Sequence, residues 1–139
     1  MLVASNSIIF LLIFQVFSTG HAEEDYQRLA LQLHNEFRAT HQAGPLMFND
    51  TLNLIAGQCA QYYADKGYCD MTCPFRSNTT EQSCYWEWRV LSNETIVQSS
   101  IDAWSSEECK HDYKREGLPG TRNFSLMAWA SSQELECQE

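Results

Sequence analysis

The spacing of apolar side chains predicts a helix over residues 25–41. Apolar residues recur there every three or four positions, so they share one face of a helix. This face is formed by Tyr26, Leu29, Ala30, Leu33 and Phe37. The Gly44-Pro45 pair that follows is typical of the end of a helix.

Two more helices follow from the same pattern. Asn49 or Asp50 can cap the second helix, and Gly67 ends it. The apolar face of this helix is formed by Leu52, Ile55, Ala56, Cys59, Ala60 and Tyr63. Ser92 or Asn93 opens the third helix. Its buried stripe is formed by Val97, Ile101 and Trp104.

Three short segments are predicted to be strands. Residues 84–90 are aromatic and loosely alternate between apolar and polar side chains, which favours a strand. A turn at residues 117–120 precedes residues 123–129 and 134–137, which we expect to form a hairpin. The order of helices and strands predicts an α+β fold, an α-β-α sandwich with helices on both sides of a small antiparallel sheet.

The first 22 residues are predicted to be a secretory signal peptide. They contain no Asp, Glu, Lys or Arg, and residues 8–17 form an apolar core. Gly20 and Ala22 supply the small side chains at the −3 and −1 positions of a cleavage site. An uncleaved anchor is the alternative, but the apolar core is shorter than the roughly 20 residues that span a bilayer. Residues 23–139 then form one extracellular domain, in which we expect no membrane span.

The charge of the chain limits its partners. All charged side chains lie in the predicted mature domain, which carries a net charge of −9. Phosphate backbones and anionic lipid headgroups repel a protein of this charge. We therefore expect no nucleic acid among its partners.

The cysteines predict disulfide bonds in an oxidising compartment. All six follow the leader: Cys59, Cys69, Cys73, Cys84, Cys109 and Cys137. The many pairings that six cysteines allow stay open. A zinc site at Cys69 and Cys73 is the alternative, but no second close cysteine pair follows. Four sequons predict a glycoprotein in which two or three sites are used. These are Asn49, Asn78, Asn93 and Asn123.

Three motifs occur in a fixed order along the chain. The first, H-N-x-x-R-x-x-H, is matched by His34, Asn35, Arg38 and His41. The second and third, W-x-x-E and H-F-T-Q-x-V-W, are matched through Trp104, Glu107, Phe124 and Trp129. Together these motifs resemble the CAP family (cysteine-rich secretory proteins, antigen 5 proteins and pathogenesis-related proteins), whose module is also called the SCP domain. The resemblance covers nearly all of residues 23–139 and implies the α-β-α sandwich of that family.

The chain departs from the family at its metal site. In the family, two histidines and two glutamates face a central cleft and can bind a divalent metal, often zinc. The resemblance places Glu81 and Glu107 at the two glutamate positions. Asn123 stands where the second histidine is usual, and no histidine between His41 and His111 supplies the first. We therefore predict a degenerate site with no tight metal and no cofactor.

The resemblance implies a secreted, non-enzymatic binding protein. Family members are implicated in binding sterols and fatty acids in apolar grooves, and in acting on target-cell proteins as venom, allergen or defence components. Tyr85, Trp86 and Trp88 can line such a groove, although ordinary core packing also accounts for them. The expected partners are a sterol, a fatty acid or an extracellular protein, in a venom-allergen-like or immunomodulatory role.

Two other functions stay open. Glu81 and Glu107 can serve as the acid and base of a secreted hydrolase. A small disulfide-rich extracellular glycoprotein of unrelated fold also agrees with the leader and the cysteines. The chain stops two residues after Cys137, where the family continues into a further strand. If this ending is genuine, we expect the sheet to have an unpaired edge. An incomplete gene model is the alternative explanation for the ending.

Overall fold

Helices make up most of the regular structure. The computed structural model describes residues 25–76, 80–115, 118–129 and 134–135. The helical elements are a first helix at residues 25–40, α2 (Asp50–Lys66), α3 (Asn93–Ser105), the 3₁₀ helix η1 (Ser106–Lys110) and α4 (Arg122–Ala128). Strands β1 (Met47–Phe48) and β2 (Glu134–Leu135) form a parallel pair.

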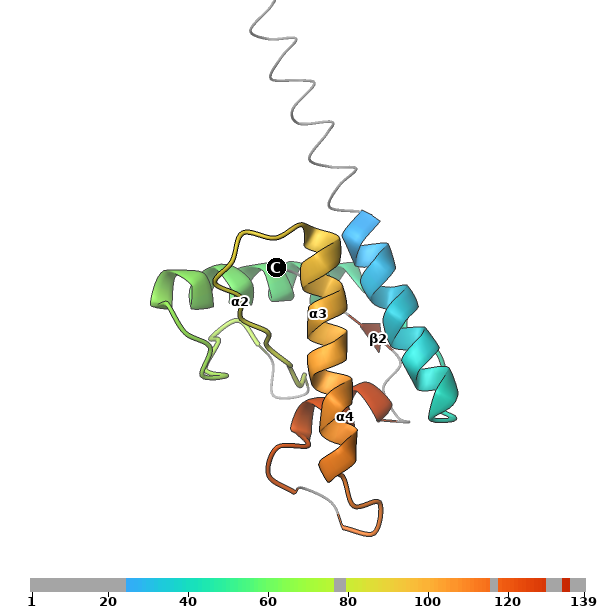
Figure 1. The fold of residues 1–139 in the computed structure, drawn as a ribbon. Helices are drawn as coiled ribbons and strands as arrows, with labels where there is room; N and C mark the ends of the chain where they lie inside the picture. The colour runs from blue at the N-terminus through green and yellow to red at the C-terminus, as the bar shows by residue number, and fades with distance from the viewer. Residues whose placement is uncertain (1–24, 77–79, 116–117, 130–133, 136–139) are drawn as a thin grey trace, which may run out of the picture.

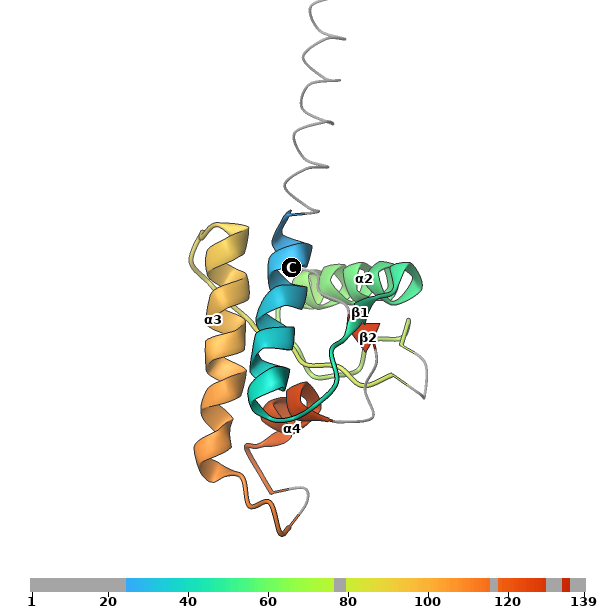
Figure 2. The ribbon, with the colours of Figure 1, turned by 90° about the vertical axis from the view of Figure 1, so that its right-hand side faces the viewer.

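The first helix and α3 run side by side in the same direction (Figure 1). Figure 2 shows α2 crossing them on one side and α4 lying at the end of the first helix. One core cluster joins the first helix to α3 through Tyr26, Ala30 and Val97, with Leu29 and Leu33 packed against them. Because α3 also packs on α4 and η1, it connects most of the helices.

Three of the predicted helix ends are confirmed. The side chain of Asn49 caps α2 by accepting hydrogen bonds from the N–H groups of Thr51 and Leu52. Gly67 ends α2 with φ 80°, a left-handed conformation that costs glycine little. Ser92 caps α3, since its side chain accepts a backbone N–H from the first turn. Polar caps and a glycine in the sequence therefore set these boundaries.

Two disulfide bonds tie α2 to the loop that follows it. Cys59 bonds to Cys73, and Cys69 bonds to Cys84. This agrees with the prediction for four of the six cysteines. Cys109 is exposed and unbonded within the described residues, and Cys137 lies outside them. Each bond closes a loop of about 15 residues, which stabilises a fold by about 3 kcal/mol in the chain-entropy treatment.

The prediction of a strand at residues 123–129 is wrong, because this segment forms α4. Its sequence also fits a helix, since Phe124 and Met127 lie three residues apart and both are buried. The acceptor that starts the helix is the carboxylate of Glu107, which binds two of its first N–H groups. That carboxylate lies outside the segment, so the local sequence does not indicate it. The pattern of apolar and polar residues within the segment therefore predicted a strand instead of a helix.

The other two predicted strands also differ from the predicted antiparallel sheet. β2 lies within the predicted second hairpin strand, but it pairs in parallel with β1 rather than with residues 123–129. Residues 84–90 lack strand pairing within the described chain. The antiparallel sheet of an α-β-α sandwich stays a prediction.

Arg38 holds the first helix to α4 and to the loop before β1. Its side chain is 0% exposed. The guanidinium Nε donates to the carbonyl of Gly44 at 2.7 Å, and Nη1 donates to those of Met127 and Trp129 at 2.8 and 3.0 Å. The last carbonyls of a helix have no partner within it and carry partial negative charge, so a buried cation satisfies them well.

We predict that Arg38→Met lowers the free energy of unfolding by about 3 kcal/mol, because it leaves several buried carbonyl groups without a donor. Urea unfolding followed by tryptophan fluorescence measures this loss. Arg28→Met is the matched control, since Arg28 lies on the same helix in an exposed ion pair with Asp25. It is expected to change the free energy by less than about 0.5 kcal/mol. Equal effects of the two variants would contradict the role given to Arg38.

Candidate functional site

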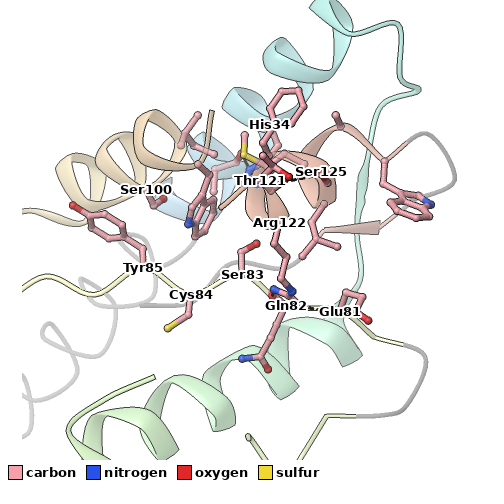
Figure 3. Close-up of a pocket in the computed structure, with 18 of the residues that line it drawn as sticks. His34, Glu81, Gln82, Ser83, Cys84, Tyr85, Ser100, Thr121, Arg122 and Ser125 are labelled. Atoms are coloured by element: carbon pink, nitrogen blue, oxygen red, sulfur yellow. Dashed lines mark hydrogen bonds and ion pairs between the residues drawn. The ribbon is translucent and has the colours of Figure 1, made fainter. Parts of the chain in front are cut away.

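A wide groove runs between the helices of the described structure. It has a volume of about 2530 Å³, larger than the several hundred Å³ of an ordinary small-molecule pocket. Figure 3 shows α3 and α4 on one side and α2 on the other, with residues 81–85 passing between them. Most of its wall is apolar. The apolar lining includes Ile55, Tyr63, Trp86, Trp104, Phe124 and Met127.

Glu107 and Asn123, both positions of the predicted degenerate metal site, bind each other. Oε1 of Glu107 accepts a hydrogen bond from the side-chain amide of Asn123 at 2.9 Å. Oε2 accepts the backbone N–H groups of Asn123 and Phe124 at 2.9 and 3.1 Å. Thr121 precedes α4 but gives it no side-chain cap. Glu107 therefore takes the place of a cap, at the helix end where a negative charge is favoured.

Glu81, the other predicted glutamate, faces two cations. Its Oε2 lies 2.7 Å from Nη2 of Arg122 and 3.9 Å from Nη1 of Arg76. Arg122 also donates to the backbone carbonyl of Gln82 (Figure 3). Glu81 itself is largely exposed, so its ion pairs lie at the rim of the groove.

These contacts do not fit a divalent metal. Both oxygens of Glu107 already accept hydrogen bonds from N–H groups, and two guanidinium groups beside Glu81 would repel a second cation. Among the described residues, no three side chains of the metal-binding types come together. The side chains at this site are therefore suited to hydrogen bonds within the protein rather than to binding an ion.

His34 and His41 of the first motif have different surroundings. His34 is 4% exposed, and its Nδ1–H donates to the carbonyl of Ala30 at 2.8 Å. Burial lowers the pKa of the His34 imidazole, and the charge of Arg38 lowers it further, although the bond to Ala30 acts in the opposite direction. His41 lies at the end of the helix, where its Nε2 is 3.2 Å from Oε1 of Glu108.

Glu108 joins the end of the first helix to the loop after η1. Its Oε1 accepts the hydroxyl hydrogen of Tyr113 at 2.9 Å and also faces His41. The hydrogen bond from Tyr113 lowers the pKa of the Glu108 carboxyl, and that from His41 lowers it further. The sequence alone does not indicate the contact between His41 and Glu108 or the ion pair between Arg122 and Glu81, because both join residues far apart in the chain.

The three aromatic residues expected to line a groove separate in the structure. Tyr85 and Trp86 lie along the groove. Trp88 is 81% exposed and packs edge-on against Trp86, with ring centroids 5.3 Å apart. The Nε1–H of Trp86 is buried and has no acceptor among the described residues. Trp86 is thus the aromatic residue of this segment that combines an apolar face with an unused donor.

The predicted glycosylation sites also differ. Asn49 uses its side-chain oxygen to cap α2, and Asn93 is the first residue of α3. The amide of Asn123 donates to Glu107, and its oxygen is buried. Asn78 lies outside the described residues. A glycan on Asn123 would compete with the hydrogen bond to Glu107.

Comparison with known families identifies the class of protein. The model of CAP, the cysteine-rich secretory protein family, matches residues 31–137. Because the match covers most of the chain, the protein belongs to the CAP family. A search of curated proteins gave no match. Within the described residues, every helix is too short or too polar to cross a membrane.

We predict that zinc does not bind tightly to residues 23–139, the expected mature protein. Calorimetric titration should give no binding heat in the micromolar range or below, because the two carboxylates are held by N–H and guanidinium groups. Micromolar or tighter binding that is lost in Glu107→Gln would contradict this prediction.

We also predict that the protein loses stability as the pH falls below about 6.5, the ordinary pKa of histidine. The pKa of His34 is lowered in the fold, so the unfolded chain binds more protons in this range and the free energy of unfolding falls with pH. Denaturant unfolding between about pH 5 and pH 7 measures the slope. His34→Gln should flatten it, whereas an unchanged slope would show that His34 is not its source.

Proposed function

We propose that this protein is a secreted, non-enzymatic CAP-domain protein that binds a sterol or fatty acid in its groove. The observation that carries the proposal is the apolar wall formed by α2, α3, α4 and residues 85–86. Removing apolar surface from water is worth about 25 cal/mol per Å², so a sterol or an acyl chain would gain several kcal/mol there. The size of the groove suits such a long ligand better than a small polar metabolite.

Secretion is supported by several features together. The CAP family is typically extracellular, and two disulfide bonds form between residues 59 and 84. The predicted leader, residues 1–22, lies outside the described residues. Its composition remains the reason to expect export.

The contacts of the two glutamates favour binding over catalysis. A general acid and base need access to a substrate atom. Glu107 is occupied by hydrogen bonds that hold α4, and Glu81 is paired with Arg122. This arrangement supports a non-enzymatic role rather than a hydrolase.

An extracellular target protein is the second candidate partner. Trp88 is 81% exposed and Val90 is fully exposed on the segment that leads into α3. Exposed aromatic side chains of this kind often contribute to protein interfaces. Such an interface would lie outside the groove.

We predict that delipidated protein binds a fluorescent sterol or a fluorescent fatty acid with micromolar affinity. Trp86→Ala should weaken this binding by about tenfold, because it removes a large part of the apolar wall. Trp88→Ala is the matched control and should change the affinity by less than about twofold, since its ring lies at the surface. A protein that binds neither ligand at micromolar concentrations would leave only the target-protein role.

A further inference from the structure

His34 places an unused hydrogen-bond acceptor at the groove. A backbone carbonyl can only accept, so the contact between Nδ1 and Ala30 requires the hydrogen of the ring to be on Nδ1. In the neutral ring, Nε2 then carries a lone pair and acts as an acceptor. Burial, which lowers the pKa of His34, favours this neutral form.

No described residue donates to this acceptor. Nε2 of His34 makes no hydrogen bond within the described chain, although His34 is 4% exposed and lines the groove. Two buried hydroxyl groups of the groove wall use their hydrogens elsewhere, since Ser100 donates to the carbonyl of Val97 and Thr121 to that of Leu118. The ring of Trp104 is the aromatic neighbour of His34, at 6.2 Å between centroids.

An acceptor such as Nε2 of His34 in an apolar wall favours ligands that can donate a hydrogen bond. Few groups in an apolar wall can complement a lone pair, and a ligand that displaces water from this acceptor without supplying a donor is disfavoured. An alcohol brings the missing hydrogen. A carboxylate brings only lone pairs, so it would face Nε2 with no hydrogen between them.

We propose that Nε2 of His34 accepts a hydrogen bond from the hydroxyl group of an apolar alcohol, such as a sterol, bound in the groove. This inference rests on the proposed function and narrows its ligand class from apolar lipids to those with a hydroxyl head. His34 is then the residue that determines specificity, while the apolar wall supplies most of the affinity.

The test compares dehydroergosterol, a fluorescent sterol, with its 3-O-methyl ether, which keeps the ring system and lacks the hydroxyl hydrogen. The wild-type protein should bind the alcohol about five- to tenfold more tightly than the ether, the usual effect of one hydrogen bond. His34→Phe should bind both ligands alike, with an affinity near that of the wild type for the ether. Ser100→Ala is the control and should keep the wild-type ratio, because its hydroxyl hydrogen is already used within α3.

A second measurement does not depend on a variant that folds. In ¹⁵N-labelled wild-type protein, the Nε2 resonance of His34 should shift when the alcohol binds and stay in place when the ether binds. Equal affinities for alcohol and ether, a preserved ratio in His34→Phe, or an unshifted resonance with the alcohol bound would overturn the inference and leave the proposed function intact. Failure of the wild type to bind either ligand would overturn the inference, and failure to bind the fluorescent fatty acid as well would overturn the proposed function.

Discussion

The buried guanidinium of Arg38 is the interaction on which the rest of the described structure depends. It reaches the carbonyl of Gly44 on one side and the end of α4 on the other. Asn35, one turn earlier, exchanges two hydrogen bonds with the backbone of Leu46. One face of the first helix thus fixes both the loop into β1 and the position of α4. The groove wall takes its shape from these polar contacts as much as from apolar packing.

The site that holds metal in the family has a different physical basis in this chain. A divalent ion would bring separate elements together by electrostatic attraction to their side chains. Here the Asn123 amide and two backbone N–H groups bind Glu107, which joins η1 to α4 without an ion. If Asn123 stands where the family has a histidine, as the resemblance implies, the exchange does more than remove a ligand, because the amide donates a hydrogen bond to the carboxylate of Glu107.

Local patterns allowed part of this structure to be predicted. The ends of α2 depend on Asn49 and Gly67, whose effects act within a few residues, and their boundaries follow from sequence. The start of α4 does not follow from the local sequence, because the group that accepts its first N–H groups is the carboxylate of Glu107, sixteen residues before Asn123. The same limit applies to the groove: the sequence indicated aromatic candidates, but only the fold separates Trp86 inside it from its exposed neighbour. The parallel pairing of β1 and β2 likewise joins segments far apart in the chain.

The two disulfide bonds are unevenly placed with respect to the groove. Both lie between residues 59 and 84, on the side of α2. Within the described residues, the side formed by the first helix, α3 and α4 contains no disulfide bond. Disulfide bonds therefore cross-link one side of the groove, whereas local opening of the other side requires no covalent bond to break. If the groove binds a lipid, as proposed above, the side without disulfide bonds is the one whose local opening would admit it.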